Sequence, residues 1–441
     1  MTKITRHDFD IPNLGPAEFP SPLQHRRYEA DAEFITDDDH RVLFDYSLEK
    51  VRSTLEAGNV PATIEHAGPR EKIFHNPART ICAIVTCGGL CPGLNDVIRG
   101  LVLSLNYSYG VRTIYGIPYG YEGFVSKYGH SPLHLTPDLV SKLHCEGGTI
   151  LGSSRGPQSR KDIVDFLVEY RVNLLFVIGG DGTLRGAQDI VAEVEQRGLK
   201  ISVIGIPKTI DNDLEYMDKS FGFETAFAEA VRTVRCAHSE AQGYPNGIGL
   251  VKLMGRDSGF ISAFAALAEN SVNYVLIPEV PFHLQGKHGL LACLEDRLAR
   301  RGHAVVVVAE GAGQHLMQEN AKALDASGNL KHGDIGPFLK RQIEQHFRSL
   351  EKEVNLKYID PSYVIRSVPA SPQDAIYCLR LAQNAVHAGM AGKTNMVVGR
   401  WHGHYVNLPM NVVTVKRRKV NPQGDLWQTV LEATGQPAEF K

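Results

Sequence analysis

The pattern of hydrophobic residues changes near residue 80, and beyond that point it predicts strands that alternate with helices. Six short apolar runs rich in β-branched residues follow one another: Ile81–Thr86, Val172–Ile178, Ile201–Ile206, Ile248–Leu253, Tyr274–Ile277 and Ala304–Ala309. Longer segments with helical spacing lie between them: Asn95–Leu105, Gly186–Gln196 and Phe223–Ala241. Continuously apolar strands that alternate with helices indicate an α/β fold whose parallel sheet is covered on both faces.

The first 78 residues differ from the rest. They are rich in proline, carry the acidic turn Asp37–Asp39, and show one short helical pattern at Tyr46–Ala57. We predict that residues 1–78 form an N-terminal extension that packs on the main body or on a neighbouring subunit.

Composition argues against several classes of partner. The chain has 47 Lys and Arg and 49 Asp and Glu, for a net charge of −2. It therefore lacks the excess of basic residues that is typical of proteins that bind nucleic acid. The seven cysteines lack paired spacings, which favours a reducing compartment over disulfides or zinc. No apolar stretch reaches the roughly 18 residues of a membrane span, and the N-terminal sequence lacks a signal-peptide core. We therefore expect a cytoplasmic protein that binds small molecules.

Glycines and polar residues gather where the predicted strands end. Five such segments follow apolar runs: TCGGLCPGLN, IGGDGTLRGA, IPKTIDND, LMGRDSG and AEGAG. Because ligands bind at the carboxyl ends of parallel strands, these segments together predict an active site. The first of them, with Gly88, is a weak phosphate-loop pattern by itself, since a tight turn also needs glycine.

The segment Gly179–Thr183 predicts a cation site beside a nucleotide. Asp181 comes directly after a buried strand, and Mg²⁺ usually takes one or two carboxylates together with phosphate oxygens and water. The alternative interpretation is that Asp181 caps a helix. The same pentapeptide also resembles the nucleotide loop of lipid kinases and of kinases that act on dinucleotides.

The segment Pro207–Asp213 is the predicted chemical centre. Asp211 and Asp213 lie two residues apart after a strand, so one carboxylate can take the proton of an acceptor hydroxyl while the other helps to hold that hydroxyl or the water around a metal. Lys208 and Thr209 can contact the transferring phosphate. The alternative is an ordinary surface turn.

Further charged residues complete the candidate site. Arg155 and Arg256 lie among glycines, and a guanidinium suits phosphate oxygens. Glu310 follows a strand, where it can bind substrate hydroxyls or make a structural contact. The basic run Lys416–Lys419 is interpreted as a solvated surface, with an anion or partner site as the alternative.

Taken in order, these segments resemble the phosphofructokinase family. The resemblance covers about residues 80–400 and rests on TCGGLCPGLNDVIRG, YGIPYGYEGF, GGTILGSSRGP, IGGDGTLRGA, PKTIDND, MGRDSG and AEGAG. It implies Mg²⁺-dependent transfer of a phosphoryl group to O1 of fructose 6-phosphate in glycolysis, by an allosteric homo-oligomer for which a tetramer is favoured over a dimer. The extension and the segment YVIRSVPAS are similar to the long-form branch of the family.

The resemblance also implies a domain plan. It predicts two doubly wound lobes with mainly parallel sheets and a site in the cleft between them. Residues 79–222 and 374–422 would form the nucleotide-binding lobe, residues 223–373 the sugar-phosphate-binding lobe, and residues 423–441 a C-terminal tail.

Matched by motif, the family's roles fall on particular residues. Asp211 would be the base, Asp213 its partner, and Asp181 the residue that organises Mg²⁺. The nucleotide side would be lined by Gly88, Tyr119, Arg155, Gly180, Gly182, Thr183 and Gly186. The sugar phosphate would be held by Thr209, Met254, Gly255, Arg256, Glu310, Arg366 and Tyr377. In many members a neighbouring subunit supplies the arginine that Arg366 resembles, and Arg256 would also face the transferring group.

Two departures from the family pattern leave questions open. Many bacterial members carry a further 6-phosphate arginine just before MGR, whereas residues 246–252 contain none; Lys252 or Lys393 could replace it. Gly182 is typical of ATP users and Lys208 of pyrophosphate users, a mixture that the long-form ATP-dependent branch shares. We therefore favour ATP as the donor. Pyrophosphate is the alternative, followed by a non-catalytic regulatory subunit and by a lipid or dinucleotide kinase.

Overall fold

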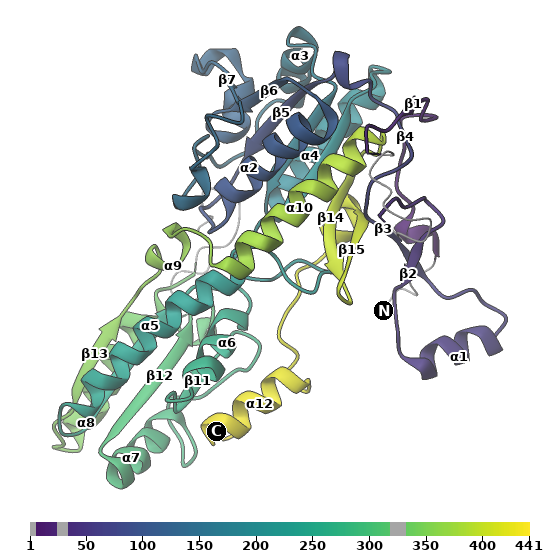
Figure 1. Ribbon diagram of the computed structural model, residues 1–441. Helices are drawn as coiled ribbons and strands as arrows, with labels where there is room; N and C mark the ends of the chain where they lie inside the picture. Colours follow the sequence, from purple (N-terminus) through teal and green to yellow (C-terminus); the bar gives the residue numbers. More distant parts are fainter. Residues whose placement is uncertain (1–5, 24–33, 318–331) are drawn as a thin grey trace. The chain divides into compact units, whose positions relative to one another are not determined.

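The computed structural model describes residues 6–23, 34–317 and 332–441 and contains two compact units (Figure 1). The first unit comprises Met1–Thr209, Leu214–Phe221 and Pro369–Arg417, and the second comprises Ile210–Asp213, Gly222–Val368 and Arg418–Lys441. Each unit is built on a mainly parallel sheet with helices, which confirms the predicted α/β fold class.

A nine-stranded sheet forms the centre of the first unit. Its strands lie in the order β2 (Arg41–Leu43), β3 (Thr63–His66), β15 (His404–Pro409), β14 (Met396–Trp401), β9 (Ser202–Pro207), β8 (Leu174–Gly179), β5 (Ile81–Thr86), β6 (Thr113–Ile117) and β7 (Leu133–His134). The strands from β14 to β6 run parallel, and the outer pairs run antiparallel.

Helices cover both faces of this sheet (Figure 1). Leu175 and Val177 of β8 join a core cluster with α3 (Arg160–Glu169) and α4 (Asp181–Gln196). Leu174 lies instead against Gly389 of α10 (Pro372–Met390), beside which α2 (Leu94–Leu103) packs. Because successive strand residues face opposite sides, every position of these strands must be apolar, which explains the continuous apolar runs.

The second unit repeats this design with four parallel strands. Their order is β11 (Tyr274–Leu276), β12 (His303–Ala309), β10 (Gly247–Leu253) and β13 (Asn355–Ile359). Ile248 and Leu250 of β10 face α7 (Leu290–Arg301) and α8 (Ile335–Ser349). On the other face Gly249 approaches α5 (Phe223–Gln242), where a Cβ would lie only 2.8 Å from the carbonyl oxygen of Ala237. Helix α6 (Phe260–Glu269) packs beside α5.

The described part of residues 1–78 belongs to the first unit; residues 1–5 and 24–33 of the predicted extension lie outside the described residues. Strands β2 and β3 lengthen the large sheet, and β1 (Phe19–Pro20) pairs with β4 (Lys72–Ile73). The helix expected near Tyr46–Ala57 is α1 (Leu48–Glu56), which has no buried residue.

Ion pairs around the buried Lys393 fasten this segment to the rest of the first unit. Lys393 Nζ lies 3.0 Å from carboxylate oxygens of Asp38 and Glu65, and Arg70 pairs with the same two residues. Because Lys393 is only 2% exposed, its charge serves these ion pairs, and the idea that it replaces the missing phosphate arginine is wrong.

The C-terminal residues belong to the second unit. Helix α12 (Asp425–Thr434) packs beside α6, and Phe440 is buried in the core of that unit. The backbones of Lys441 and His288 exchange two hydrogen bonds. The segment predicted as a tail therefore carries a helix and a buried aromatic residue.

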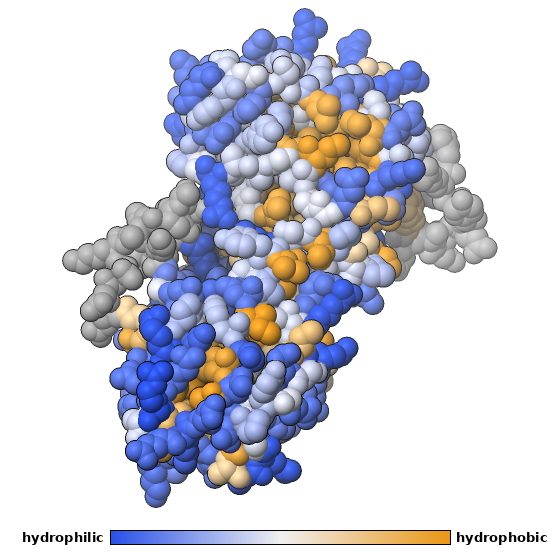
Figure 2. Space-filling model, turned by 90° about the vertical axis from the view of Figure 1, so that its left-hand side faces the viewer, coloured by the Kyte–Doolittle hydropathy of each residue, from blue (hydrophilic) through white to orange (hydrophobic). Residues whose placement is uncertain are grey.

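Two further helices are short. Helix α9 (Val364–Ser367) follows β13, and α11 (Met410–Val413) follows β15. The face shown in Figure 2 is mostly hydrophilic with separate hydrophobic areas. No helix in the described ranges is both long and apolar enough to cross a membrane.

Candidate active site

The predicted nucleotide residues follow neighbouring strands of the parallel sheet in the first unit. Gly88 comes after β5, Tyr119 after β6, Asp181 after β8 and Lys208 after β9. These strands are adjacent and parallel, so their carboxyl ends share one edge, where such sheets bind ligands.

Lys208 connects two of these strand ends. It is 6% exposed, its Nζ donates a hydrogen bond to Gly89 O at 2.6 Å, and its backbone N–H donates to Gly179 O at 3.0 Å. A Cβ at Gly88 would lie 3.4 Å from Lys208 Nζ and 4.0 Å from Thr183 Oγ1. The β5 loop, the GGDGT segment and the lysine therefore converge.

Asp181 is the first residue of α4, and Gly180 is the N-cap. The alternative that Asp181 caps a helix is therefore wrong. Helix α4 also begins before the predicted start at Gly186, because Asp181, Gly182 and Thr183 belong to its first turn. Asp181 Oδ2 accepts hydrogen bonds from Arg185 Nη2 at 2.6 Å and from Arg417 Nη2 at 3.5 Å. Its Oδ1 is buried and has no hydrogen-bond partner among the residues that the structure describes. A carboxylate held through one oxygen, with the other left over, fits a cation ligand.

The glycines of this segment serve different purposes. A Cβ at Gly182 would meet no described atom within 4 Å, whereas a Cβ at Gly180 would lie 3.3 Å from Lys208 O. At Gly186 a Cβ would lie 2.8 Å from the ring of Tyr121, whose hydroxyl donates to Thr183 O at 2.7 Å. Gly182 therefore leaves space, and Gly186 makes room for a packed tyrosine.

Tyr119 and Arg155 are accessible beside these loops. Tyr119 has a left-handed backbone with φ of 55° and is 50% exposed, and its N–H donates to Leu151 O at 2.7 Å. A Cβ at Gly152 would lie 2.8 Å from the Tyr119 ring, so glycine is required for this contact. Arg155 is exposed.

Within the part of the chain that the structure describes, the cysteines and the acidic side chains provide no separate metal site. No group of three or more His, Cys, Asp or Glu in the described residues could hold a metal ion. Burial raises the pKa of the Cys87 thiol to about 12, so this residue beside Gly88 stays protonated and acts in packing. A cation at this edge would therefore depend on Asp181 and on oxygens from the ligand.

The loop Ile210–Asp213 belongs to the second unit. Ser258 Oγ lies 3.1 Å from Asp211 O, and the Arg418 N–H donates to Asp213 O at 2.7 Å. Asn212 has φ of 55°, a conformation that asparagine tolerates better than most residues. The loop backbone is thus anchored on both sides of Asn212, and Asp213 is buried while Asp211 is half-buried.

The MGRDSG segment is tightly folded around Arg256. This residue has a left-handed backbone with φ of 51°, and its N–H donates to Glu310 Oε1 at 2.9 Å. A Cβ at Gly311 would lie 1.9 Å from Arg256 O, and a Cβ at Gly255 would lie 2.5 Å from Ser258 O. The structural role of Glu310 is confirmed, and its contact with substrate stays a prediction. Met254 is half-buried at the start of this segment.

The predicted phosphate contacts differ in their surroundings. The Arg366 guanidinium stacks 4.8 Å from the centre of the Tyr363 ring, and its buried Nε has no hydrogen-bond partner within the described residues, as an anion ligand would need. Lys252 Nζ lies 3.0 Å from Asp334 and 2.8 Å from Asp360, so two carboxylates already compensate its charge.

Tyr377 corrects one sequence prediction. Its side chain is 2% exposed, and its hydroxyl donates to Lys219 O at 2.8 Å. Because the ring is buried and the hydroxyl is already bonded, Tyr377 packs α10 in the core, and the predicted contact with the substrate is wrong.

The basic run Lys416–Lys419 is only partly the solvated surface that we predicted. Lys416 is a surface residue that pairs with Glu215 at 3.4 Å, but Arg417 contacts Asp181. The Arg418 guanidinium lies 4.9 Å from the centre of the Phe260 ring. Sequence reasoning missed these contacts because a run of four cations has the same appearance on an open surface and beside an acidic site.

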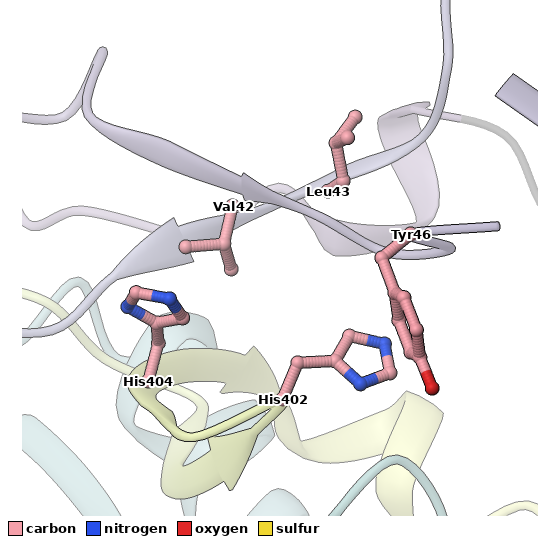
Figure 3. Close-up of a pocket in the computed structure, with 5 residues that line it drawn as sticks. All are labelled: Val42, Leu43, Tyr46, His402 and His404. Carbon is pink, nitrogen blue, oxygen red and sulfur yellow. The ribbon is translucent and has the colours of Figure 1, made fainter. Parts of the chain in front are cut away.

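The pocket in Figure 3 lies elsewhere in the first unit and contains none of the predicted residues. Its volume is about 550 Å³, and its lining residues are Val42, Leu43, Tyr46, His402 and His404. Tyr46 and His402 make an edge-to-face contact with ring centres 4.2 Å apart. The strand ends, rather than this pocket, locate the candidate site.

Comparison with known sequences agrees with these strand-end motifs. Residues 81–389 match the family model for phosphofructokinase. The chain is 48% identical to an ATP-dependent 6-phosphofructokinase of Amycolatopsis methanolica, over 98% of this chain and 96% of that protein. It is 47% identical to an ATP-dependent 6-phosphofructokinase of Borreliella burgdorferi, over 98% of each chain.

Comparison with solved structures agrees with the fold. A pyrophosphate-dependent phosphofructokinase from Marinobacter aquaeolei is similar with a TM-score of 0.66 and 20% identity, over 81% of this chain and 91% of that one. A Pichia pastoris phosphofructokinase is similar with a TM-score of 0.63 and 20% identity, over 91% of this chain and 44% of that one. With the family model matching more than half of its length, the chain belongs to the phosphofructokinase family.

Proposed function

We propose that this protein catalyses the transfer of the γ-phosphoryl group of ATP to O1 of fructose 6-phosphate, giving fructose 1,6-bisphosphate and ADP in glycolysis. The observation that carries the proposal is the anchored Ile210–Asp213 loop, which follows a strand end and presents two carboxylates two residues apart. Two relatives that match nearly the whole chain are both named as ATP-dependent 6-phosphofructokinases, which supports ATP as the donor.

Asp211 is the proposed base. It takes the proton of the O1 hydroxyl while O1 forms a bond to the γ-phosphorus and the bond between that phosphorus and the β,γ-bridging oxygen breaks, so that ADP leaves with the electron pair. Asp213 would assist at the acceptor, and Thr209, Lys208 and Arg256 would contact the transferring group. Positioned proton transfer and fixed charges of this kind are the main contributions that a protein makes to phosphoryl transfer.

The nucleotide is proposed to bind at the strand-end loops of the first unit. Gly88, Tyr119, Arg155, Gly180, Gly182, Thr183 and Gly186 are the residues proposed to line its site. The N-terminus of α4 can donate backbone N–H groups to phosphate oxygens, and the open space at Gly182 fits an α-phosphate that pyrophosphate would lack. Asp181 would hold Mg²⁺, which when bound neutralises charge on the phosphate oxygens.

The sugar phosphate is proposed to bind to Met254, Gly255, Arg256, Glu310 and Arg366. We propose that Arg366 acts across an interface between copies of the chain, because Tyr363 and Val364 beside it are 73% and 60% exposed and exposed apolar residues favour a partner surface. A homotetramer is the preferred assembly. The cytoplasm stays the proposed location, from the cysteine usage of the sequence.

A donor assay tests this function. Purified protein with fructose 6-phosphate and Mg²⁺ should form fructose 1,6-bisphosphate and ADP when ATP is supplied, and little product when pyrophosphate is supplied. Lys208 is the feature that keeps pyrophosphate as the second candidate. Turnover with pyrophosphate alone would overturn the donor, and no turnover with either donor would favour a regulatory subunit. Lipid and dinucleotide acceptors in the same panel should give no product.

A further inference from the structure

The end of the basic run and the residue after it form a short strap in the second unit. We define the C-terminal strap as Arg418–Val420. At one end the Arg418 N–H donates to Asp213 O at 2.7 Å, and at the other the Val420 N–H donates to Glu279 Oε1 at 2.8 Å. The Arg418 guanidinium covers the ring of Phe260 at 4.9 Å. The strap is therefore fastened both to the loop that carries the proposed base and to a glutamate that no motif includes.

Glu279 also holds a second support of the same loop. Its Oε1 accepts a hydrogen bond from the N–H of Gly259 at 3.0 Å, and Gly259 is the N-cap of α6. Ser258, the residue before it, lies 3.1 Å from Asp211 O through Oγ. One carboxylate oxygen thus joins the strap behind Asp213 to the helix start behind Asp211.

The local packing is built for this contact. A Cβ at Gly259 would lie 2.4 Å from Ile277 Cγ2 and 3.0 Å from Glu279 Oε2, so the glycine lets the strand end and its glutamate approach the helix. Burial raises the pKa of the Glu279 carboxyl, and the N–H groups of Val420 and Gly259 oppose that rise. Two N–H donors on one oxygen show that the position of this oxygen, which the length of the side chain sets, is used.

We propose that Glu279 is a positioning residue for phosphoryl transfer: by tying the C-terminal strap to the start of α6 it sets the backbone of Ile210–Asp213. Its effect on catalysis rests on the proposed function, because it acts through Asp211. Small displacements of a reacting group can cost as much as about 10²-fold in rate, so a support two hydrogen bonds away from the base has measurable consequences.

Two substitutions separate reach from charge. Glu279→Gln keeps a carbonyl oxygen at the same distance and removes the charge, whereas Glu279→Asp keeps the charge and withdraws the oxygen by about 1.5 Å, the length of one carbon–carbon bond. Positioning predicts that Glu279→Asp lowers kcat about tenfold with the KM for ATP unchanged, and that Glu279→Gln retains most of the activity. Glu295→Asp is the matched control, because this partly exposed glutamate of the same unit pairs with His346 and Lys352, outside the motifs.

Hydrogen exchange supplies a readout that does not depend on turnover. Positioning predicts that the amides of the C-terminal strap exchange about tenfold faster in Glu279→Asp than in the wild type or in Glu295→Asp, a loss of protection of the kind that follows a broken hydrogen bond. If the wild-type protein shows no kinase activity, the proposed function fails while this measurement still tests the tie.

The two readouts also define what overturns the proposal. Equal kcat and equal exchange in Glu279→Asp and the wild type would show that the tie has no effect. A variant pair in which Gln is impaired and Asp is normal would assign the role to the charge of Glu279 instead. Faster exchange of the strap with unchanged kcat would make Glu279 a structural residue only.

Discussion

Strand-end segments of the two units use glycine in opposite ways. In the first unit, Gly182 lies in the opening turn of α4, and a Cβ there would meet no described atom within 4 Å. In the second unit, a Cβ at Gly311 would come within 1.9 Å of Arg256 O, and Gly255 is similarly crowded by Ser258 O. One glycine leaves room for something outside the protein, and the others are filled by the protein's own backbone.

This difference shows where the backbone of each unit is restricted by close packing. The second unit holds a non-glycine residue, Arg256, in the left-handed region and stabilises it through Glu310; strain of this kind persists only where the surroundings impose it. The first unit instead leaves one buried oxygen of Asp181 without a hydrogen-bond partner among the described residues and has no described atom within 4 Å of a Cβ at Gly182. The second unit is therefore constrained by its own backbone at this segment, whereas the first unit is less crowded at Gly182.

The largest expected effect tests Asp211, the proposed base. Asp211→Ser should lower kcat by about 10²-fold or more, since it removes a positioned base, and it should leave the KM for fructose 6-phosphate nearly unchanged. Asp296→Ser, at an exposed carboxylate of the same unit that pairs with Arg300, is the control and should have little effect. Steady-state kinetics of the two variants decides; full activity in Asp211→Ser would show that the base is another group.

The comparison of glycines is tested directly by a matched pair of alanine substitutions. Gly311→Ala should lower the free energy of unfolding by about 2 kcal/mol, because the new methyl group must displace the Arg256 carbonyl. Gly182→Ala should leave stability unchanged or raise it by up to about 1 kcal/mol, since alanine favours a helix over glycine. Urea unfolding measures both, and similar losses at the two positions would show that the two glycines are equally constrained.

The open space at Gly182 is tested by filling it with charge. Gly182→Asp should fold normally and lower kcat/KM for ATP about tenfold or more, a barrier change of at least about 1.4 kcal/mol, because the carboxylate would crowd and repel an α-phosphate. Turnover with pyrophosphate, if any is present in the wild type, should fall less. Unaltered use of ATP would show that the nucleotide does not occupy this space.

The smallest expected effect is a loss of stability in acid that arises from His75 in the first unit. Burial lowers the pKa of His75 from 6.5 to about 4, and its Nε2 lies 2.9 Å from Ser202 Oγ of β9. The folded protein resists a proton that the unfolded chain accepts, so this contribution to stability is present above pH 6.5 and is lost as the pH falls toward 4; at pH 6 the loss is on the order of 1 kcal/mol.

A variant that lacks His75 checks that contribution. His75→Gln should make the free energy of unfolding less dependent on pH between 7 and 5, whereas His134→Gln, at an exposed position of β7, should keep the wild-type slope. Urea unfolding of the three proteins at several pH values provides the measurement. An unchanged slope in His75→Gln would assign the acid sensitivity to other groups.

Sequence reasoning was accurate where periodicity reports burial on both faces. The apolar runs became β5, β8, β9, β10, β11 and β12, because a strand buried on two faces must be apolar at every position. It was inaccurate for side chains whose polar or charged group suggests a ligand although the side chain is buried. Tyr377 has a polar hydroxyl that suggests a ligand, yet its ring lies in the core. Lys393 has a charge that suggests phosphate, yet it is buried and paired with two carboxylates.

The sequence by itself determined the α/β class, the strand-end segments and the aspartates in them, because these depend on residues close together in the chain. Only the tertiary structure decided which oxygen of Asp181 is left over, since Arg417 reaches that carboxylate from 236 positions away. It alone decided that Glu279, outside every motif, joins the C-terminal strap to the start of α6. Such contacts form between residues that folding brings together from distant positions, and neither spacing nor composition records them.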